Sequence, residues 1–210
     1  MKRRSFWLMV LLGGAALVGV MVLRPTAPRL TNFPPSATGP WVAFGDSLTE
    51  GHGAEPGGDY PSQLSRRLGI PIVNLGRGGV TTGEGLARVD EVVALRPRVV
   101  LLCLGGNDVL RQQSSAEMMS NLDAIIERLH HGGSFVVLLG IRSASLRDRN
   151  QKAFDRLARD RQVLLVPDLL DGVMFRPELM ADPIHPNERG YAKIAERVEQ
   201  RLAPWLPKLR

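Results

Sequence analysis

Residues 41–204 alternate between two hydrophobic periods. Short, continuous apolar runs predict buried strands, and longer stretches with apolar residues three or four positions apart predict amphipathic helices. The expected strands are residues 41–44, 70–75, 98–104, 134–139 and 162–166. The expected helices are residues 60–68, 82–95, 116–130, 146–160 and 187–202. The run 98–104 is apolar on both faces, which is typical of a central strand in a parallel sheet.

Strands that alternate with helices predict parallel βαβ units joined by right-handed crossovers. The expected fold class is therefore α/β, a three-layer α/β/α sandwich with a five-stranded parallel sheet covered on both faces. In such open sheets, ligands bind beyond the carboxyl ends of the strands. The residues that follow each strand are thus the first candidates for function.

The first 24 residues differ in composition from the rest of the chain. Lys2, Arg3 and Arg4 precede residues 6–23, which carry no charge. As a helix, this run would span about 27 Å, close to a hydrocarbon core of roughly 30 Å. The segment is expected to be a retained membrane anchor or a cleaved signal peptide, and its length favours the anchor. The basic end should stay in the cytoplasm, which sends the downstream chain across the membrane.

Residues 25–40 contain five prolines and are expected to form an extended linker before a domain over residues 41–210. The net charge is +6, but four of the 27 basic residues lie within residues 1–24, and the remaining 23 face 21 acidic residues. No nucleic-acid-binding motif is present, so we expect no nucleic-acid partner. The single cysteine, Cys103, excludes an internal disulfide and a cysteine-rich metal site; we expect it to be buried.

Polar residues follow four of the expected strands in chain order. These clusters are Gly45-Asp46-Ser47, Gly76-Arg77-Gly78-Gly79, Gly105-Gly106-Asn107-Asp108 and Asp182-Pro183-Ile184-His185. Taken singly, each is also typical of an ordinary turn or helix cap. Because the carboxyl ends of parallel strands share one edge, we expect the four clusters to converge.

Together these clusters contain the groups that acyl transfer requires. A serine hydroxyl needs an adjacent base to become nucleophilic, so Ser47 is a candidate nucleophile and His185 its candidate base. Asp182 lies three residues before His185 and can fix the imidazole tautomer. The developing oxyanion needs donors, and the candidates are the backbone N–H groups of Ser47 and Gly79 and the side-chain amide of Asn107.

The same blocks resemble those of a known family, the SGNH/GDSL hydrolases. The matching residues are Gly45-Asp46-Ser47-Leu48, Gly79, Gly105-x-Asn107-Asp108 and Asp182-x-x-His185. Within the family, residues 73–74, 85–88, 104–108 and 184–187 are most similar to the bacterial periplasmic multifunctional thioesterase/lysophospholipase/arylesterase group. Pro183 departs from the glycine that close relatives often carry.

The resemblance implies a flavodoxin-like sheet of order 2-1-3-4-5 and the roles given above for Ser47, Asp182, His185, Gly79 and Asn107. It implies no cofactor and no metal. Three further residues are candidates near the substrate. Asp46 and Asp108 are also expected to hold loops by accepting backbone N–H groups, and Arg142 follows the fourth expected strand.

The sequence therefore predicts a serine esterase or thioesterase acting on acyl esters, with arylesterase, lysophospholipase and acyl-thioester substrates all open. Two alternatives remain: an O-acetylesterase acting on carbohydrate or peptidoglycan, and a non-catalytic, membrane-tethered binding module. The expected partners are the acyl substrate and, through the N-terminal segment, the membrane. The expected location is the periplasm, either attached to the inner membrane or released after cleavage.

Overall fold

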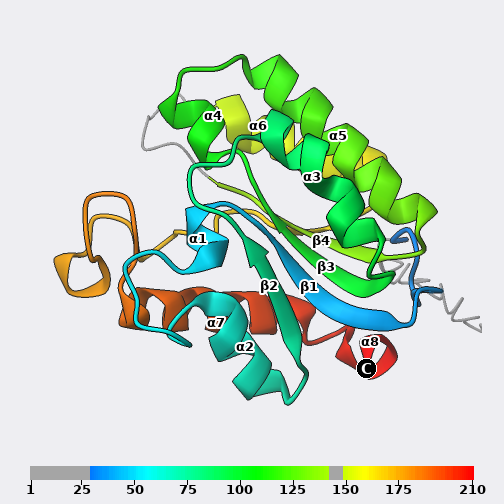
Figure 1. Cartoon of the computed structure of the whole chain (residues 1–210), viewed down its shortest axis with the longest axis horizontal. Coiled ribbons are helices and arrows are strands. Elements are labelled where there is room, and N and C mark those ends of the chain that lie inside the picture. The colour runs from blue at the N-terminus through cyan, green and yellow to red at the C-terminus, as the bar shows by residue number, and fades with distance from the viewer. Residues whose placement is uncertain (1–28, 142–148) are drawn as a thin grey trace, which may run out of the picture.

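The computed structural model describes residues 29–141 and 149–210 (Figure 1). The expectations for residues 1–24 and for Arg142 lie outside the described residues. Five parallel strands form one sheet in the order β2-β1-β3-β4-β5, which confirms the expected fold class and strand order. The strands are β1 (Gly39–Gly45), β2 (Ile72–Gly76), β3 (Pro97–Cys103), β4 (Phe135–Leu139) and β5 (Leu164–Val166).

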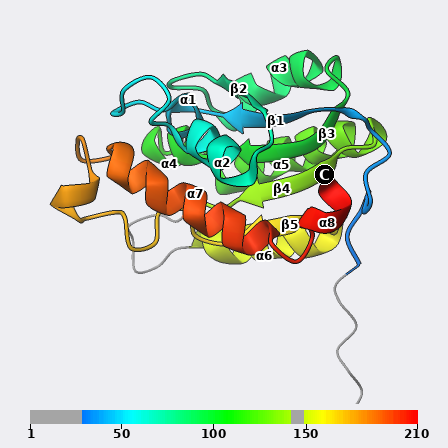
Figure 2. The ribbon, with the colours of Figure 1, turned by 90° about the horizontal axis from the view of Figure 1, so that it is seen from below.

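Helices cover both faces of the sheet (Figures 1 and 2). One layer contains α2 (Tyr60–Leu68), α7 (Glu188–Leu202) and α8 (Leu206–Leu209). The opposite layer contains α3 (Thr82–Val93), α5 (Ser115–His131) and α6 (Arg149–Arg161). Three short elements, α1 (Ser47–Glu50), α4 (Gly106–Leu110) and the 3-10 helix η1 (Pro177–Leu179), lie in the connections.

The sheet separates two hydrophobic cores because successive strand residues point to opposite faces. On β3, Leu101 belongs to the core beneath α2 and α7, whereas Val100 and Leu102 belong to the core beneath α3 and α5. All three are fully buried, as expected for the central strand. Cys103 is also buried, and burial raises the pKa of its thiol well above its usual value, so it is held as a protonated thiol.

The last part of the expected linker packs against the domain. The Phe33 ring lies 5.7 Å from the Phe135 ring and 4.8 Å from the Trp205 ring, measured between centroids. Ala37 is buried, and β1 begins at Gly39. The proline content of this stretch does not reveal the apolar side chains that fix residues 29–40 to the domain.

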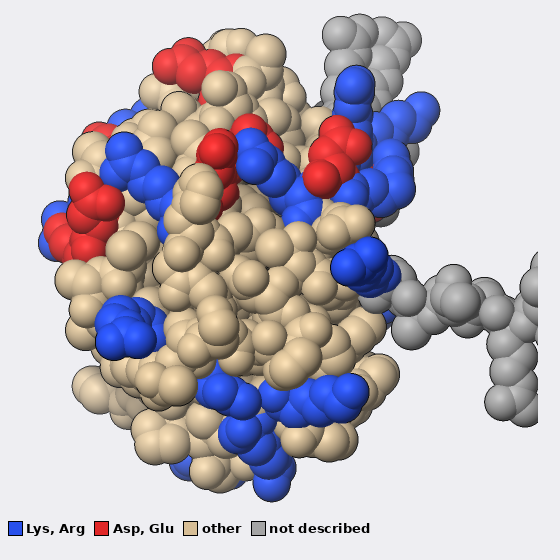
Figure 3. Space-filling view, turned by 90° about the vertical axis from the view of Figure 1, so that its right-hand side faces the viewer, with Lys and Arg blue, Asp and Glu red and all other residues tan. Residues whose placement is uncertain are grey.

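Figure 3 views the domain from the side where the strands have their amino ends. On this face, basic side chains stand in separate groups, and acidic side chains lie beside several of them. Among the described residues, none of the helices is both long enough and apolar enough to cross a membrane.

Two glycines bring the loops at the carboxyl edge into close contact. A Cβ on Gly45 would lie 2.1 Å from Thr49 Oγ1, and one on Gly76 would lie 2.1 Å from the backbone nitrogen of Glu50. Both distances are shorter than any real contact, so only glycine allows α1 to pack directly on β1 and β2. The first turn after β1 is therefore held against its neighbouring strand.

Candidate active site

Ser47 is the first residue of α1, immediately beyond the carboxyl end of β1. Asp46 caps this helix, because its Oδ1 accepts the Leu48 N–H at 3.1 Å. The first N–H groups of a helix have no intrahelical acceptor. Within the part of the chain that the structure describes, the Ser47 N–H has no hydrogen-bond acceptor. The residue thus offers a hydroxyl and a free N–H at the sheet edge.

His185 links Ser47 to Asp182. His185 Nδ1 lies 2.7 Å from Asp182 Oδ2, and His185 Nε2 lies 3.0 Å from Ser47 Oγ. Asp182 Oδ1 also accepts the backbone N–H groups of Ile184 and His185, each at 2.8 Å. The structure therefore brings together the serine, imidazole and carboxylate that the sequence predicts to meet.

The hydrogen bonds to Asp182 determine its charge. The Ile184 N–H and the His185 ring lower the pKa of the Asp182 carboxyl to about 2. The carboxylate is consequently ionised at neutral pH and favours the His185 tautomer that carries its proton on Nδ1. In that tautomer, Nε2 can accept a proton from Ser47.

The segment carrying Asp182 and His185 is fixed at both ends. The Ala181 N–H donates to the His185 carbonyl at 2.9 Å, which closes a tight turn. Asn187 caps α7 by accepting the Gly190 N–H at 3.1 Å, and its amide donates to the Glu178 carbonyl at 3.1 Å. The base is therefore placed by the start of α7 and by the turn before it.

Asn107 and Gly79, the other expected oxyanion donors, lie on neighbouring loops. Asn107 Nδ2 donates to the Val80 carbonyl at 3.0 Å and, over a longer 3.4 Å, to Asp46 Oδ2. Gly79 has φ +76°, in the left-handed region that favours glycine. A Cβ on the adjacent Gly78 would lie 4.0 Å from Ser47 Cβ, so this loop passes directly beside Ser47.

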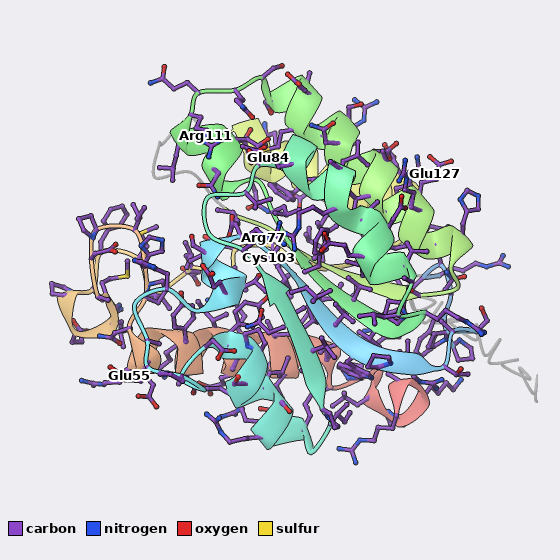
Figure 4. The ribbon with its side chains drawn as sticks, in the orientation of Figure 1. Glu55, Arg77, Glu84, Cys103, Arg111 and Glu127 are labelled. Carbon is purple, nitrogen blue, oxygen red and sulfur yellow. The ribbon has the colours of Figure 1, made fainter. Side chains whose placement is uncertain are left out.

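The end of α4 holds the Gly79 loop from outside. The Arg111 guanidinium donates to the Gly79 carbonyl at 2.7 Å and lies 3.8 Å from Glu84 Oε2, an arrangement visible in Figure 4. Asp108 accepts the Thr82 N–H at 2.9 Å and the Thr82 hydroxyl at 2.5 Å. Asp108 is therefore a loop-holding residue, buried and turned toward the start of α3.

An apolar pocket of about 330 Å³ opens beside Ser47. Asp46, Asn107 and His185 supply part of its polar lining. Its apolar wall contains Leu48, Val109, Leu110, Ile141, Leu170, Met174, Phe175, Pro183 and Ile184. Phe175 is 75% exposed and adopts φ +65°, a conformation that bulky side chains rarely take. The pocket can receive an extended apolar group whose polar end lies at Ser47.

His52, on the loop that follows α1, lies against the reactive groups. Its ring centroid is 4.3 Å from that of His185, and its Nε2 is 3.9 Å from Asp182 Oδ2. Among the described residues 29–141 and 149–210, the side chains of His52, Asp182 and His185 form the one cluster of possible metal ligands that is close enough to share an ion. The spacing of five residues from Ser47 could not predict this contact, because it depends on the path of the loop after α1.

The buried Asp46 carboxyl makes the stability of the fold depend on pH. Burial, the largest cause, raises its pKa from 3.8 to about 7, with a further contribution from Asp108. Between these values, the folded protein keeps a proton that the unfolded chain has released. Stability therefore falls as pH rises from about 4 to 7.

Asp46→Asn keeps a capping oxygen and removes the ionisation. We expect its free energy of unfolding, relative to wild type, to be higher at pH 8 than at pH 5 by roughly 3 kcal/mol.

Urea denaturation at the two pH values measures this difference. Asp155→Asn, at a partly exposed position on α6, is the matched control and should show little change. An equal effect of Asp46→Asn at pH 5 and pH 8 would contradict the raised pKa.

Comparison with known proteins places this site in a family. Residues 43–193 match the GDSL-like lipase/acylhydrolase family. An arylesterase of Vibrio mimicus is 33% identical over 177 residues, covering 79% of this chain and 88% of the relative. Thioesterase 1/protease 1/lysophospholipase L1 of Escherichia coli strain K12 is 30% identical over 184 residues, covering 83% of this chain and 88% of the relative.

A solved structure agrees with these relatives. The crystal structure of TesA has a TM-score of 0.74 at 29% sequence identity, covering 79% of this chain and 98% of that chain. The matches confirm the family resemblance that the four sequence blocks indicate. The protein is an ester hydrolase, and its chain belongs to the GDSL-like lipase/acylhydrolase family.

Proposed function

We propose that the chain hydrolyses acyl esters and thioesters through an acyl-Ser47 intermediate. The observation that carries this proposal is the continuous contact from Asp182 through His185 to Ser47, with distances of 2.7 Å and 3.0 Å. This order of carboxylate, imidazole and hydroxyl is the one that activates a serine. The relatives named arylesterase and thioesterase/lysophospholipase support both ester and thioester substrates.

The proton transfers follow from the tautomer that Asp182 favours. His185 Nε2 accepts the Ser47 proton as Oγ attacks the acyl carbon, and Asp182 stabilises the resulting imidazolium. The same nitrogen then protonates the departing alcohol or thiol. In the second half of the reaction, His185 removes a proton from water, which attacks the acyl-serine and releases the acid.

The oxyanion is stabilised by donors that are already positioned. The Ser47 N–H is free at the start of α1, and the Gly79 N–H lies on the glycine loop that Arg111 holds. Asn107 uses its amide for the Val80 carbonyl and for a long contact to Asp46. We propose that the oxyanion replaces Asp46 in the second of these contacts, because 3.4 Å is a weak hydrogen bond.

Removing either reacting group should abolish hydrolysis. We expect Ser47→Ala and His185→Ala each to lower kcat for a p-nitrophenyl acyl ester by roughly 10⁴-fold or more, because each removes a member of a unit that acts together. The measurement is the steady-state rate of ester hydrolysis, corrected with a blank that contains no enzyme.

Matched substitutions at exposed positions, Ser115→Ala and His131→Gln, should keep the wild-type rate. Circular dichroism of all four variants separates loss of chemistry from loss of fold. If folded Ser47→Ala turned over at a rate near wild type, the acyl-serine mechanism would be wrong.

The apolar pocket favours a medium or long acyl chain over acetyl. Each methylene buried in such a wall is worth about 0.8 kcal/mol, or roughly fourfold in kcat/KM. We therefore expect kcat/KM to rise along a series of p-nitrophenyl esters from acetate to octanoate. Phe175→Ala should weaken the preference for the longer esters and leave acetate unchanged. A sharp optimum at acetate would instead support an O-acetylesterase.

We further propose that the catalytic domain works in the periplasm, attached to the inner membrane through residues 1–24 or released there by cleavage. The support is the charge-free run of residues 6–23 behind three basic residues. Intact-mass measurement of protein from membrane and periplasmic fractions tests this location. We expect the full-length mass in the membrane fraction, or a mass shortened by the segment in the periplasm. Full-length protein confined to the cytosol would contradict both forms.

A further inference from the structure

His52 lies on a loop that is fixed next to the Asp182–His185 turn. Its N–H donates to the Ser47 carbonyl at 3.0 Å, and its carbonyl accepts the Tyr191 hydroxyl at 2.8 Å. The next residue, Gly53, has φ +91°, and a Cβ there would lie 2.7 Å from the Pro186 carbonyl oxygen. The loop backbone is thus packed tightly against the turn, and the position of His52 is built into the fold.

The His52 side chain faces Asp182 without forming a hydrogen bond. Its Nε2 is 3.9 Å from Asp182 Oδ2, and 60% of the side chain is exposed. The ring is tilted by 53° over the His185 ring. The relay from Asp182 to Ser47 is complete without this imidazole. The His52 Nε2 atom therefore lies beside the Asp182 carboxylate and takes no part in the contacts that link Asp182, His185 and Ser47.

Two imidazoles and one carboxylate form a donor set that suits zinc. The candidate atoms of His52, Asp182 and His185 all lie within 4.8 Å of one another. Zinc binds imidazole nitrogen and carboxylate oxygen at about 2.0–2.1 Å, so two ligands of a tetrahedral ion lie roughly 3.4 Å apart. The 3.9 Å between His52 Nε2 and Asp182 Oδ2 must shorten slightly, which the exposed His52 side chain permits. The 2.7 Å hydrogen bond between Asp182 Oδ2 and His185 Nδ1 must open by roughly 0.7 Å to admit the ion.

We propose that this cluster is an inhibitory site for Zn²⁺, held by His52 Nε2, Asp182 Oδ2 and His185 Nδ1. Solvent can reach it, because the His52 and Asp182 side chains are 60% and 37% exposed. Neither His52 nor Asp182 lines the apolar pocket, so an ion held between them leaves that pocket open. Hard cations such as Mg²⁺ and Ca²⁺ require more oxygen ligands than one carboxylate provides, so the site discriminates against them.

Inhibition follows from the proton balance on the imidazole, a step that rests on the proposed role of His185. Zn²⁺ takes the Nδ1 lone pair, so the proton that Nδ1 carried is released to solvent and Nε2 takes one up. The neutral, metal-bound ring then carries its proton on Nε2 and cannot accept one from Ser47. Asp182, engaged by the ion, no longer supports an imidazolium. Removal of the ion restores the working tautomer.

The test is Zn²⁺ inhibition of p-nitrophenyl ester hydrolysis, corrected for hydrolysis by Zn²⁺ alone. We expect reversible inhibition that EDTA removes, with no inhibition by Mg²⁺ at the same concentration. His52→Gln should keep the basal kcat/KM within about twofold and raise the inhibitory Zn²⁺ concentration at least tenfold, because even indirect supports of a metal site contribute about that much. His131→Gln, an exposed histidine at the end of α5, should keep wild-type sensitivity.

A binding measurement separates this inference from the proposed mechanism. Ser47→Ala keeps all three ligands, so it should bind one Zn²⁺ in a competition titration against a chromophoric chelator, with or without activity. The double variant His52→Gln/Ser47→Ala should bind at least tenfold more weakly. Equal Zn²⁺ affinity in the two variants, or no binding to Ser47→Ala, would overturn the zinc site. Retained hydrolysis by Ser47→Ala would instead overturn the acyl-serine mechanism.

Discussion

The hydrogen bond between Ser47 and His185 joins the turn after β1 to the turn before α7, and the arrangement of the site depends on it. The two residues are 138 positions apart. They meet because β1 is near the centre of a parallel sheet and because α7 begins at the same edge. A parallel sheet thus converts distant chain segments into neighbours at one edge.

Asp182 and Asp46 both lie beside the reactive groups, but their different surroundings give them different roles. Asp182 accepts backbone N–H groups and the His185 ring, and its carboxyl has a pKa of about 2. Asp46 is buried beneath Ser47, and its carboxyl has a pKa of about 7. The first therefore carries a fixed negative charge that orients the base, whereas the second holds the α1 turn and limits the negative charge beneath the nucleophile.

The sequence predicts the elements with strong periodicity and the identity of the polar clusters. Residues 99–104 are apolar throughout, which correctly indicates the central strand β3. The helix over 60–68 is predicted with the bounds that α2 has. Short elements escape prediction, because the four residues of α1 and the five of α4 contain too few positions to show a period.

Contacts between loops are the other part that the sequence could not reveal. The stacking of His52 on His185 depends on the tight packing at Gly53. The exposure of Phe175 at the pocket depends on a left-handed backbone that no aromatic residue favours. The convergence of the expected site residues at one edge follows from the fold.

The Arg111 contact to the Gly79 carbonyl has a consequence for how the glycine loop keeps its shape. Gly78 and Gly79 contribute no side chains, so the loop after β2 has few side chains with which to fix itself. Its conformation is set by residues that follow β3, namely Arg111, Asn107 and Asp108. The loop is thus held by its neighbour, and its shape is a property of two adjacent crossover connections together.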